Sequence, residues 1–80
     1  MTVMETISEI IRDILDDKNM IITMDTTARD CEDWDSLAQL QIIIATERRF
    51  NIRFITKEIK LLKTVGDFVS LVDEKLLKAN

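Results

Sequence analysis

The stretch from Ser36 to Phe50 constrains the fold most, because a clear helix start leads into more apolar residues than a surface helix needs. Acidic residues crowd its approach. Asp35 or Ser36 can cap the first turn, since a short oxygen side chain accepts a hydrogen bond from an unpaired backbone N–H group. Acidic side chains also suit the positive end of the helix dipole. These features predict a helix from about Ser36 to Phe50.

The apolar residues of this helix fall into two stripes when the chain turns by about 100° per residue. One stripe contains Ile42, Ile43, Thr46 and Phe50, with Gln39 among them. The other contains Leu37, Leu40 and Ile44, bordered by Gln41, Glu47 and Arg48. One stripe can face the core, and in so small a domain the other should be partly exposed, as apolar partner sites often are. The alternative is a central helix that is buried all round.

Two longer segments also have helical patterns. The first runs from about Val3 to Asp17, with a single apolar face made of Met4, Ile7, Ile10, Ile11, Ile14 and Leu15. The last opens where Thr64 and Asp67, three residues apart, resemble a capping box with Asp in place of Glu. It continues through about Leu77, and its expected buried stripe is Val65, Phe68, Val69, Val72 and Leu76, with Asp73, Glu74, Lys75 and Lys78 in solvent.

A shorter helix is expected between these, from about Lys57 to Leu62, with Thr56 as its cap and with Ile59 and Leu62 facing inward. The predicted fold class is therefore all-α. It is a small helical bundle of three main helices plus one short helix, with a long loop between the first and second helices. We expect residues 1–80 to form a single domain, as is usual for a chain of this length.

The long connection, residues 18 to 35, lacks Gly and Pro. A connection of this length in a compact domain is normally functional or pinned down, and Ile21, Ile22 and Met24 could pin it by packing into the core. Trp34 is either a partly buried anchor, because an indole buries a large apolar area, or an exposed contact beside Ser36.

Composition excludes several function classes. The longest apolar runs are far shorter than a membrane span, and the N-terminus lacks the features of a signal peptide, so we expect a cytoplasmic protein. A metal site is not expected, because there is no histidine and the acidic loop lacks the glycine and spacing of a calcium loop. The single cysteine, Cys31, is interpreted as a bystander. Acid–base catalysis is also disfavoured: Asp35 is expected to be ionised and too weak a base to activate Ser36.

Charge is distributed unevenly along the chain. Residues 1–35 hold ten acidic and three basic residues, whereas residues 36–80 hold five acidic and eight basic residues. The basic residues of the second half are scattered and aromatic residues are few, so nucleic acid is not an expected partner. A basic surface on a partner protein suits the acidic approach to Ser36 better.

The order of these features resembles the phosphopantetheine attachment region of acyl carrier proteins. The family's core motif is Asp-Ser-Leu, here Asp35-Ser36-Leu37, and its serine carries the prosthetic arm. The resemblance continues through the apolar helix to Phe50, then through residues 51–54 (Asn-Ile-Arg-Phe), and on to residues 64–67 (Thr-Val-Gly-Asp), which open the last helix. Together with the first helix, it covers nearly the whole chain.

The resemblance implies a carrier that is not itself an enzyme. A separate phosphopantetheinyl transferase would use coenzyme A to attach 4′-phosphopantetheine to Ser36, with Asp35 and Leu37 beside it, and acyl-loading and acyl-using enzymes would be the other partners of a monomer. The implied partner surface is Leu37, Leu40, Gln41, Ile44, Glu47, Arg48 and Phe54. Ile59 and Leu62 are the implied lining of an acyl cavity, although simple core filling is the equally direct interpretation.

Two departures from the family are visible. Ile55 stands where acyl carrier proteins often have a proline, and Glu47 is the one acidic residue between Ser36 and Phe50, whereas this helix is strongly acidic in fatty-acid carriers. We therefore expect a specialised carrier that serves a dedicated pathway, such as polyketide, peptide, lipid or surface-glycan modification. The main alternative is a small helical protein-interaction domain in which Ser36 is only a helix cap.

Overall fold

The computed structural model describes residues 2–30 and 33–78, so the expectations for Cys31 and Glu32 lie outside the described residues. The described chain is helical, with four α-helices and one 3-10 turn: α1 (Val3–Leu15), η1 (Ala28–Asp30), α2 (Ser36–Phe50), α3 (Thr56–Lys60) and α4 (Val65–Lys78). The all-α prediction of three main helices, one short helix and a long loop after the first is confirmed. None of the helices in the described ranges is long and apolar enough to cross a membrane.

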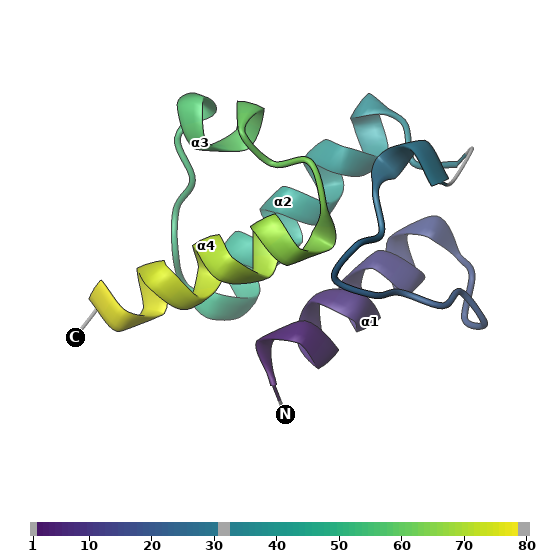
Figure 1. Ribbon diagram of the computed structural model, residues 1–80, viewed down its shortest axis with the longest axis horizontal. Coiled ribbons are helices and arrows are strands. Elements are labelled where there is room, and N and C mark those ends of the chain that lie inside the picture. Colours follow the sequence, from purple (N-terminus) through teal and green to yellow (C-terminus); the bar gives the residue numbers. More distant parts are fainter. Residues whose placement is uncertain (1, 31–32, 79–80) are drawn as a thin grey trace.

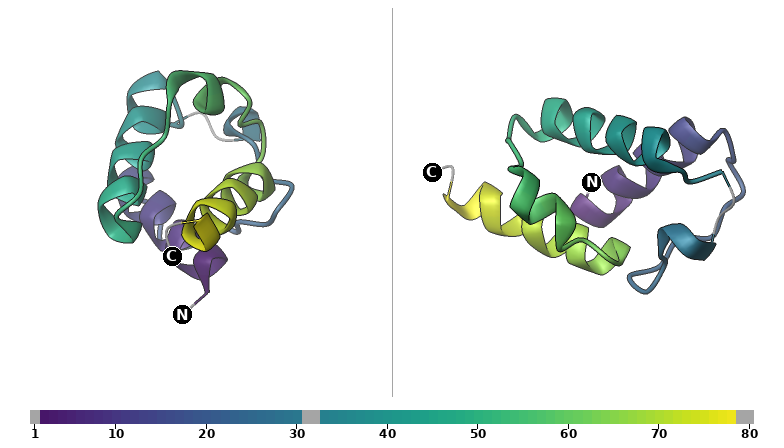
Figure 2. Two further views of the ribbon diagram at one scale, coloured as in Figure 1. Left: turned by 90° about the vertical axis from the view of Figure 1, so that its left-hand side faces the viewer. Right: turned by 90° about the horizontal axis from the view of Figure 1, so that it is seen from above.

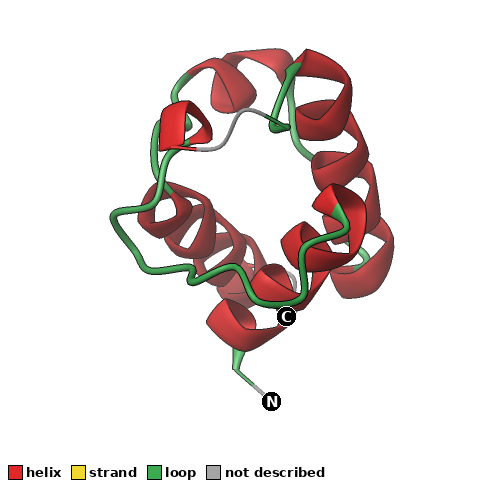
Figure 3. Ribbon diagram, turned by 90° about the vertical axis from the view of Figure 1, so that its right-hand side faces the viewer, coloured by secondary structure: helices red, strands yellow, loops and turns green. Residues whose placement is uncertain are grey.

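The helices surround one hydrophobic core (Figures 1 and 3). Helix α1 packs against both α2 and α4. Helix α3 lies on the opposite side of the molecule from α1 and bridges α2 and α4 (Figure 2). Ile7, Ile11, Ile42, Val65 and Val72 are almost fully buried at the centre. The predicted apolar faces of the first and last helices therefore share one core with the buried stripe of α2.

Helix α1 begins where expected and ends two residues early. Thr2 caps it by accepting a hydrogen bond from the Glu5 backbone N–H at 3.1 Å. The helix ends at Leu15 because Asp16 adopts the left-handed conformation, with φ of 54°. The expected end at Asp17 is wrong for this local reason, which helical periodicity does not reveal.

The long connection is pinned mainly by its backbone, which lies against the start of α4. The Thr26 carbonyl accepts the Val65 N–H at 2.9 Å, and the Met24 carbonyl accepts the Gly66 N–H at 2.8 Å. A Cβ atom at position 66 would lie 2.9 Å from the Met24 carbonyl oxygen, so glycine permits this close approach. These bonds hold the middle of the connection beside the start of α4.

Of the three apolar side chains expected to pin the connection, Ile22 is the one that is buried. Ile21 is 84% exposed and Met24 is 45% exposed, so the expectation that they pack into the core is wrong. Adjacent residues of an extended segment point to opposite sides, so Ile21 and Ile22 cannot both face the core.

The two C-terminal helices start in different ways. At α4 the predicted capping box is present: the Asp67 N–H donates to Thr64 Oγ1 at 3.0 Å, and the Thr64 N–H donates to Asp67 Oδ2 at 3.2 Å. At α3 the expected Thr56 cap is wrong, because Thr56 is the first helical residue and Ile55 occupies the cap position. Glu58 Oε1 accepts the Ile55 N–H at 3.0 Å instead. Helix α3 ends at Lys60, two residues before the expected Leu62.

Candidate functional site

Ser36 is the first residue of α2 and is not its cap. Asp35 is the cap: its backbone is extended, and its Oδ1 accepts the Ala38 N–H at 2.8 Å. Ser36 is exposed, and its hydroxyl has no hydrogen-bond partner among the described residues. The expectation that Ser36 is the helix cap is therefore wrong.

The surroundings of Ser36 suit a phosphate ester. Within the described chain, the backbone N–H groups of Ser36 and Leu37 lack hydrogen-bond partners, because the first intrahelical bond runs from the Gln39 N–H to the Asp35 carbonyl. These N–H groups lie at the positive end of the α2 dipole, which favours a bound phosphate. An exposed primary hydroxyl at this place is thus chemically suited to carry a phosphodiester-linked group.

An apolar cleft of about 570 Å³ opens beside Ser36. It is bounded by the long connection and the start of α2 on one side and by α3 and the start of α4 on the other. The residues that line it are Thr26, Thr27, Ala28, Trp34, Asp35, Ser36, Gln39, Ile59, Leu62, Lys63, Thr64, Val65 and Phe68. Both side chains expected to line an acyl cavity, Ile59 and Leu62, are therefore among them, and each is half-buried.

Sequence reasoning missed the floor of this cleft, Val65 and Phe68. Their helical spacing in α4 predicted that both residues are buried, and the structure confirms this. Spacing within one helix shows that a residue faces inward, but it does not show which inward-facing residues border a cavity. Which buried residues border the cavity depends on where α3 lies.

Trp34 combines the two roles that were left open. It is half-buried and packs against the core, so it anchors the end of the long connection. Its indole N–H donates to Gln39 Oε1 at 2.6 Å, and both side chains line the cleft next to Ser36. The hydrogen bond satisfies the polar atom of the indole, as expected for a partly buried tryptophan.

The charges around the cleft are mostly acidic on the α2 side. Asp33 and Asp35 are exposed there, and Asp30 Oδ2 accepts the Thr27 N–H at 3.0 Å. On the far side, Asp67 Oδ2 accepts the backbone N–H groups of Lys63 and Thr64, and these two bonds lower the pKa of the Asp67 carboxyl. Among the described residues, no three potential ligands gather into a metal cluster.

The second stripe of α2 is exposed, as predicted, so the alternative of a helix buried all round is wrong. Leu37, Leu40 and Ile44 are 64%, 51% and 39% exposed. On the opposite face, Ile42, Ile43 and Thr46 are buried. Of the polar residues expected at the border of the exposed stripe, Gln41 and Arg48 are exposed and Glu47 is half-buried.

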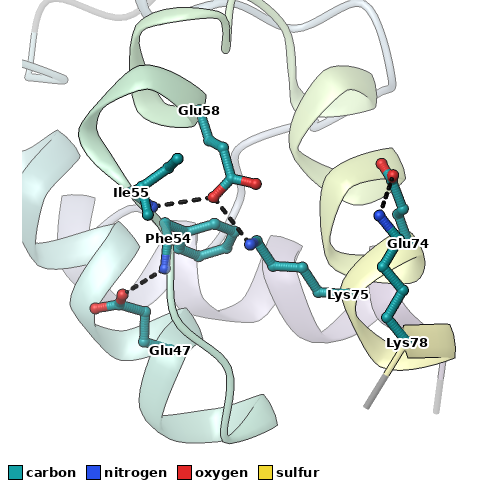
Figure 4. A network of polar contacts seen from close by, with 7 residues as sticks. All are labelled: Glu47, Phe54, Ile55, Glu58, Glu74, Lys75 and Lys78. Carbon is teal, nitrogen blue, oxygen red and sulfur yellow. Dashed lines mark hydrogen bonds and ion pairs between the residues drawn. The ribbon is translucent and has the colours of Figure 1, made fainter. Parts of the chain in front are cut away.

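Phe54 does not belong to this exposed surface, and its expected place there is wrong. It is 9% exposed, and its ring lies 5.4 Å from the Phe68 ring, centroid to centroid. The backbone explains this position: Asn51 ends α2 in the left-handed conformation, and Glu47 Oε2 then accepts the Phe54 N–H at 2.9 Å. The chain therefore turns back and directs Phe54 into the core (Figure 4).

A polar network ties α3 to α4 behind the cleft (Figure 4). Glu58 Oε1 accepts both the Ile55 N–H and a bond from Lys75 Nζ, which lies 2.9 Å away. The bonds from Lys75 and Ile55 lower the pKa of the Glu58 carboxyl. Lys75 was expected in solvent, but it is half-buried, with its ammonium 5.6 Å from the centre of the Phe54 ring. Its apolar stem covers the core while its charge is paired.

Comparison with known proteins gives consistent matches along most of the chain, although no family model matches it. The acyl carrier protein of Streptococcus pyogenes is 41% identical over 75 residues, which cover 94% of this chain and 97% of that protein. The acyl carrier protein of Acidothermus cellulolyticus is 30% identical over 73 residues, which cover 91% and 87%. A solution structure of the holo acyl carrier protein from Geobacter metallireducens matches with a TM-score of 0.90 and 35% identity, covering 99% of this chain and 91% of that one.

Proposed function

The chain belongs to the acyl carrier protein family, and on that premise we propose that it carries acyl or aminoacyl groups as thioesters on a 4′-phosphopantetheine arm attached to Ser36. One observation supports this most directly. The Ser36 hydroxyl is exposed at the first position of α2, beside an apolar cleft, and has no hydrogen-bond partner within residues 2–30 and 33–78. Residues 1–80 form one carrier domain in this proposal.

The attachment chemistry needs a second protein. The Ser36 hydroxyl must lose a proton as its oxygen attacks a phosphorus of the coenzyme A pyrophosphate, and the adenosine bisphosphate leaves. This chain has no histidine, and Asp35 already holds the Ala38 N–H. The base therefore comes from a phosphopantetheinyl transferase, and in this proposal the carrier itself is not an enzyme.

The chain's own residues position the product. Asp35 fixes the first turn of α2, and the N–H groups of Ser36 and Leu37 face the new phosphodiester at the positive end of the helix. When bound, the arm supplies a terminal thiol that holds the cargo as a thioester. We propose that an acyl chain on that thiol can enter the cleft between Ile59, Leu62 and the floor residue Phe68.

The exposed stripe of α2 is the proposed docking surface for the transferase and for the enzymes that load and use the acyl group. Leu37, Leu40 and Ile44 supply apolar contact area, with Gln41, Glu47 and Arg48 at the border. A small interface suits a carrier that must release each partner quickly. We propose that the protein acts as a monomer in the cytoplasm, without nucleic acid or a metal ion.

The charge of α2 supports a specialised carrier rather than the housekeeping fatty-acid carrier. Glu47 is the one acidic residue of this helix, and its carboxylate is engaged by the Phe54 N–H. An enzyme whose docking surface is basic therefore finds little negative charge along α2 beyond the Ser36 end. A fatty-acid synthase enzyme that used the loaded protein as efficiently as its own carrier would contradict this part of the proposal.

The deciding experiment is intact mass spectrometry after incubation with coenzyme A and a broad-specificity phosphopantetheinyl transferase. We expect a gain of one phosphopantetheine in the unmodified chain and none in Ser36→Ala. Ser70→Ala is the matched control, because Ser70 is also an exposed helical serine and should leave the gain intact. No gain with several transferases would favour the interaction-domain alternative, in which Ser36→Ala keeps its partner.

A further inference from the structure

The exposed stripe of α2 ends, at the opposite end of the helix from Ser36, in a groove with a positively charged rim. The groove has a volume of about 380 Å³ and is lined by Ile44, Glu47, Arg48, Asn51, Ile52 and Arg53. Ile44 and Ile52 are the two apolar residues of its lining. Arg48 and Arg53 are exposed at its rim.

The guanidinium groups at the rim are not used by the fold. Within the described ranges, the two ion pairs join Lys75 to Glu58 and Lys78 to Glu74, and neither Arg48 nor Arg53 takes part in one. The one acid in the groove, Glu47, already accepts the Phe54 N–H at 2.9 Å. The groove thus offers two unpaired cations beside apolar surface, which is a suitable setting for carboxylates of another molecule.

The groove and Leu37, the residue that follows Ser36, lie on one face of α2. At about 100° per residue, Leu37, Ile44 and Arg48 fall within about 40° of one another around the helix. Arg48 lies twelve residues beyond Ser36, or about 18 Å along the axis. An ordinary interface buries about 800 Å² on each partner, which spans that distance. An enzyme that reaches Ser36 over Leu37 and the rest of this face is therefore large enough to cover the groove as well.

Helix stability accounts for only part of this arrangement. Basic residues in the last turn stabilise a helix through its dipole, and this applies equally to Arg48 and Arg49. It does not apply to Arg53, which follows the helix and lines the same groove as Arg48. Arg49 is exposed too but does not line the groove, so it serves as an internal control.

We propose that this groove binds a segment of the partner enzyme in which two carboxylates flank an apolar side chain. The carboxylates pair with Arg48 and Arg53, and the apolar side chain contacts Ile44. Identifying the partner as an enzyme that acts on the arm rests on the proposed function, whereas the groove's preference for an acidic segment does not. Such a partner needs positive charge near Asp33 and Asp35 and negative charge about 18 Å away, so reversed docking would place like charges together.

The test is an NMR titration of the full chain, without the arm, with two synthetic helical peptides of equal length. Both carry leucines at helical spacing, one with glutamates and the other with lysines at the remaining positions. We expect the glutamate peptide to shift the amide signals of Ile44, Arg48 and Arg53 saturably, and the lysine peptide not to do so. The variant Arg48→Gln/Arg53→Gln should weaken binding by about tenfold or more, and Arg49→Gln by no more than about twofold.

Three outcomes would overturn the proposal: no saturable shifts with the glutamate peptide, equal binding of the lysine peptide, or an Arg49→Gln loss as large as that of the double variant. Circular dichroism of each variant shows that its helices are intact. Because the titration uses the chain without its arm, its result is independent of whether Ser36 accepts phosphopantetheine. Failure of the groove and failure of the carrier function are therefore distinguished.

Discussion

The two walls of the cleft beside Ser36 are built very differently. On one side, α2 is a fifteen-residue helix whose Ile42 and Ile43 are buried in the core and whose start is capped by Asp35. On the other side, α3 has five residues, none of them fully buried, and its cap residue, Ile55, makes no side-chain cap bond. The wall that carries the serine is thus fixed by the core, whereas the opposite wall depends on a few contacts.

Unfilled space on both sides of α3 strengthens this contrast. Leu62, just after α3, lines the cleft beside Ser36 and also a second cleft of about 270 Å³ that faces α4. Leu61 beside it is 69% exposed. A wall with space on either side can shift without breaking the close packing that resists motion in a core. The difference teaches that Ser36 can stay fixed in position while the volume of the cleft beside it varies.

The largest expected effect compares one side chain from each wall. Ile42→Ala removes volume from a site that is 1% exposed, so we expect a loss of about 3 kcal/mol in the free energy of unfolding. Ile59 borders an open cleft that water can enter, so Ile59→Ala leaves no dry cavity. The loss in the free energy of unfolding should therefore be about 1 kcal/mol. Urea denaturation followed by circular dichroism measures both. Equal losses would show that the two walls are equally integrated into the core.

The next effect compares the two helix starts. Asp67→Ala removes the acceptor of the Lys63 and Thr64 N–H groups, whereas Thr56→Ala removes no hydrogen bond found in the described chain. We expect a clearly lower thermal midpoint for Asp67→Ala at pH 7 and little change for Thr56→Ala. Because folding lowers the Asp67 pKa below 3.8, its ionised form stabilises the fold above that value, and the difference from Asp67→Ala should disappear as the pH falls through the folded pKa.

A difference between Asp67→Ala and wild type that persisted unchanged after an NMR titration showed the Asp67 carboxyl to be protonated would contradict this interpretation. Asp67→Asn separates charge from hydrogen bonding. It keeps one acceptor oxygen for the two N–H groups and should lie between wild type and Asp67→Ala.

The well-packed part of the molecule is also the part that the sequence allowed us to predict. Helix α2 has a capping residue, Asp35, and a periodic apolar stripe, and its bounds match the prediction at both ends. The start of α4 was predictable because Thr64 and Asp67 have the spacing that reciprocal bonds require. In both places a short-range chemical rule and the burial of one face point to the same structure.

The sparsely packed part could not be predicted, because long-range contacts decide it. Phe54 follows a left-handed turn at Asn51, and only the positions of α2 and α4 direct it into the core. Lys75 looked like a solvated residue because its partner, Glu58, is distant in sequence. The cleft itself exists because α3 stands away from α2, and no residue pattern within one helix encodes that separation.

A smaller and local effect tests how α3 is held. Glu58→Gln keeps an acceptor for the Ile55 N–H but removes the charge paired with Lys75, while Glu74→Gln removes the charge of the exposed pair with Lys78. We expect faster amide hydrogen exchange in α3 for Glu58→Gln, with little change in α1 and α2 and none from Glu74→Gln. Uniformly faster exchange in all helices would instead show that α3 opens only when the whole domain unfolds.

The smallest expected effect is a pH-dependent loosening of α3. Folding lowers the Glu58 pKa below its ordinary value of 4.5, chiefly through the Lys75 bond and then through the Ile55 N–H. The ionised carboxylate therefore stabilises docked α3 fully above pH 4.5, and this contribution is lost as the pH falls through the folded pKa. The Ile55 amide signal, followed by NMR from pH 7 to pH 2, should report a midpoint below 4.5.

Two lysine variants make this titration specific. Lys75→Met keeps the apolar stem beside Phe54 but removes the partner charge, so the Ile55 midpoint should rise toward 4.5. Lys78→Met should raise it much less, because Lys78 acts on Glu58 only through a weak long-range attraction. Equal shifts in the two variants would mean that general surface charge, rather than the Glu58–Lys75 bond, sets the ionisation of Glu58. The packing of α3 would then rest on the apolar contacts of Ile59 and Leu62 rather than on the bond between Glu58 and Lys75.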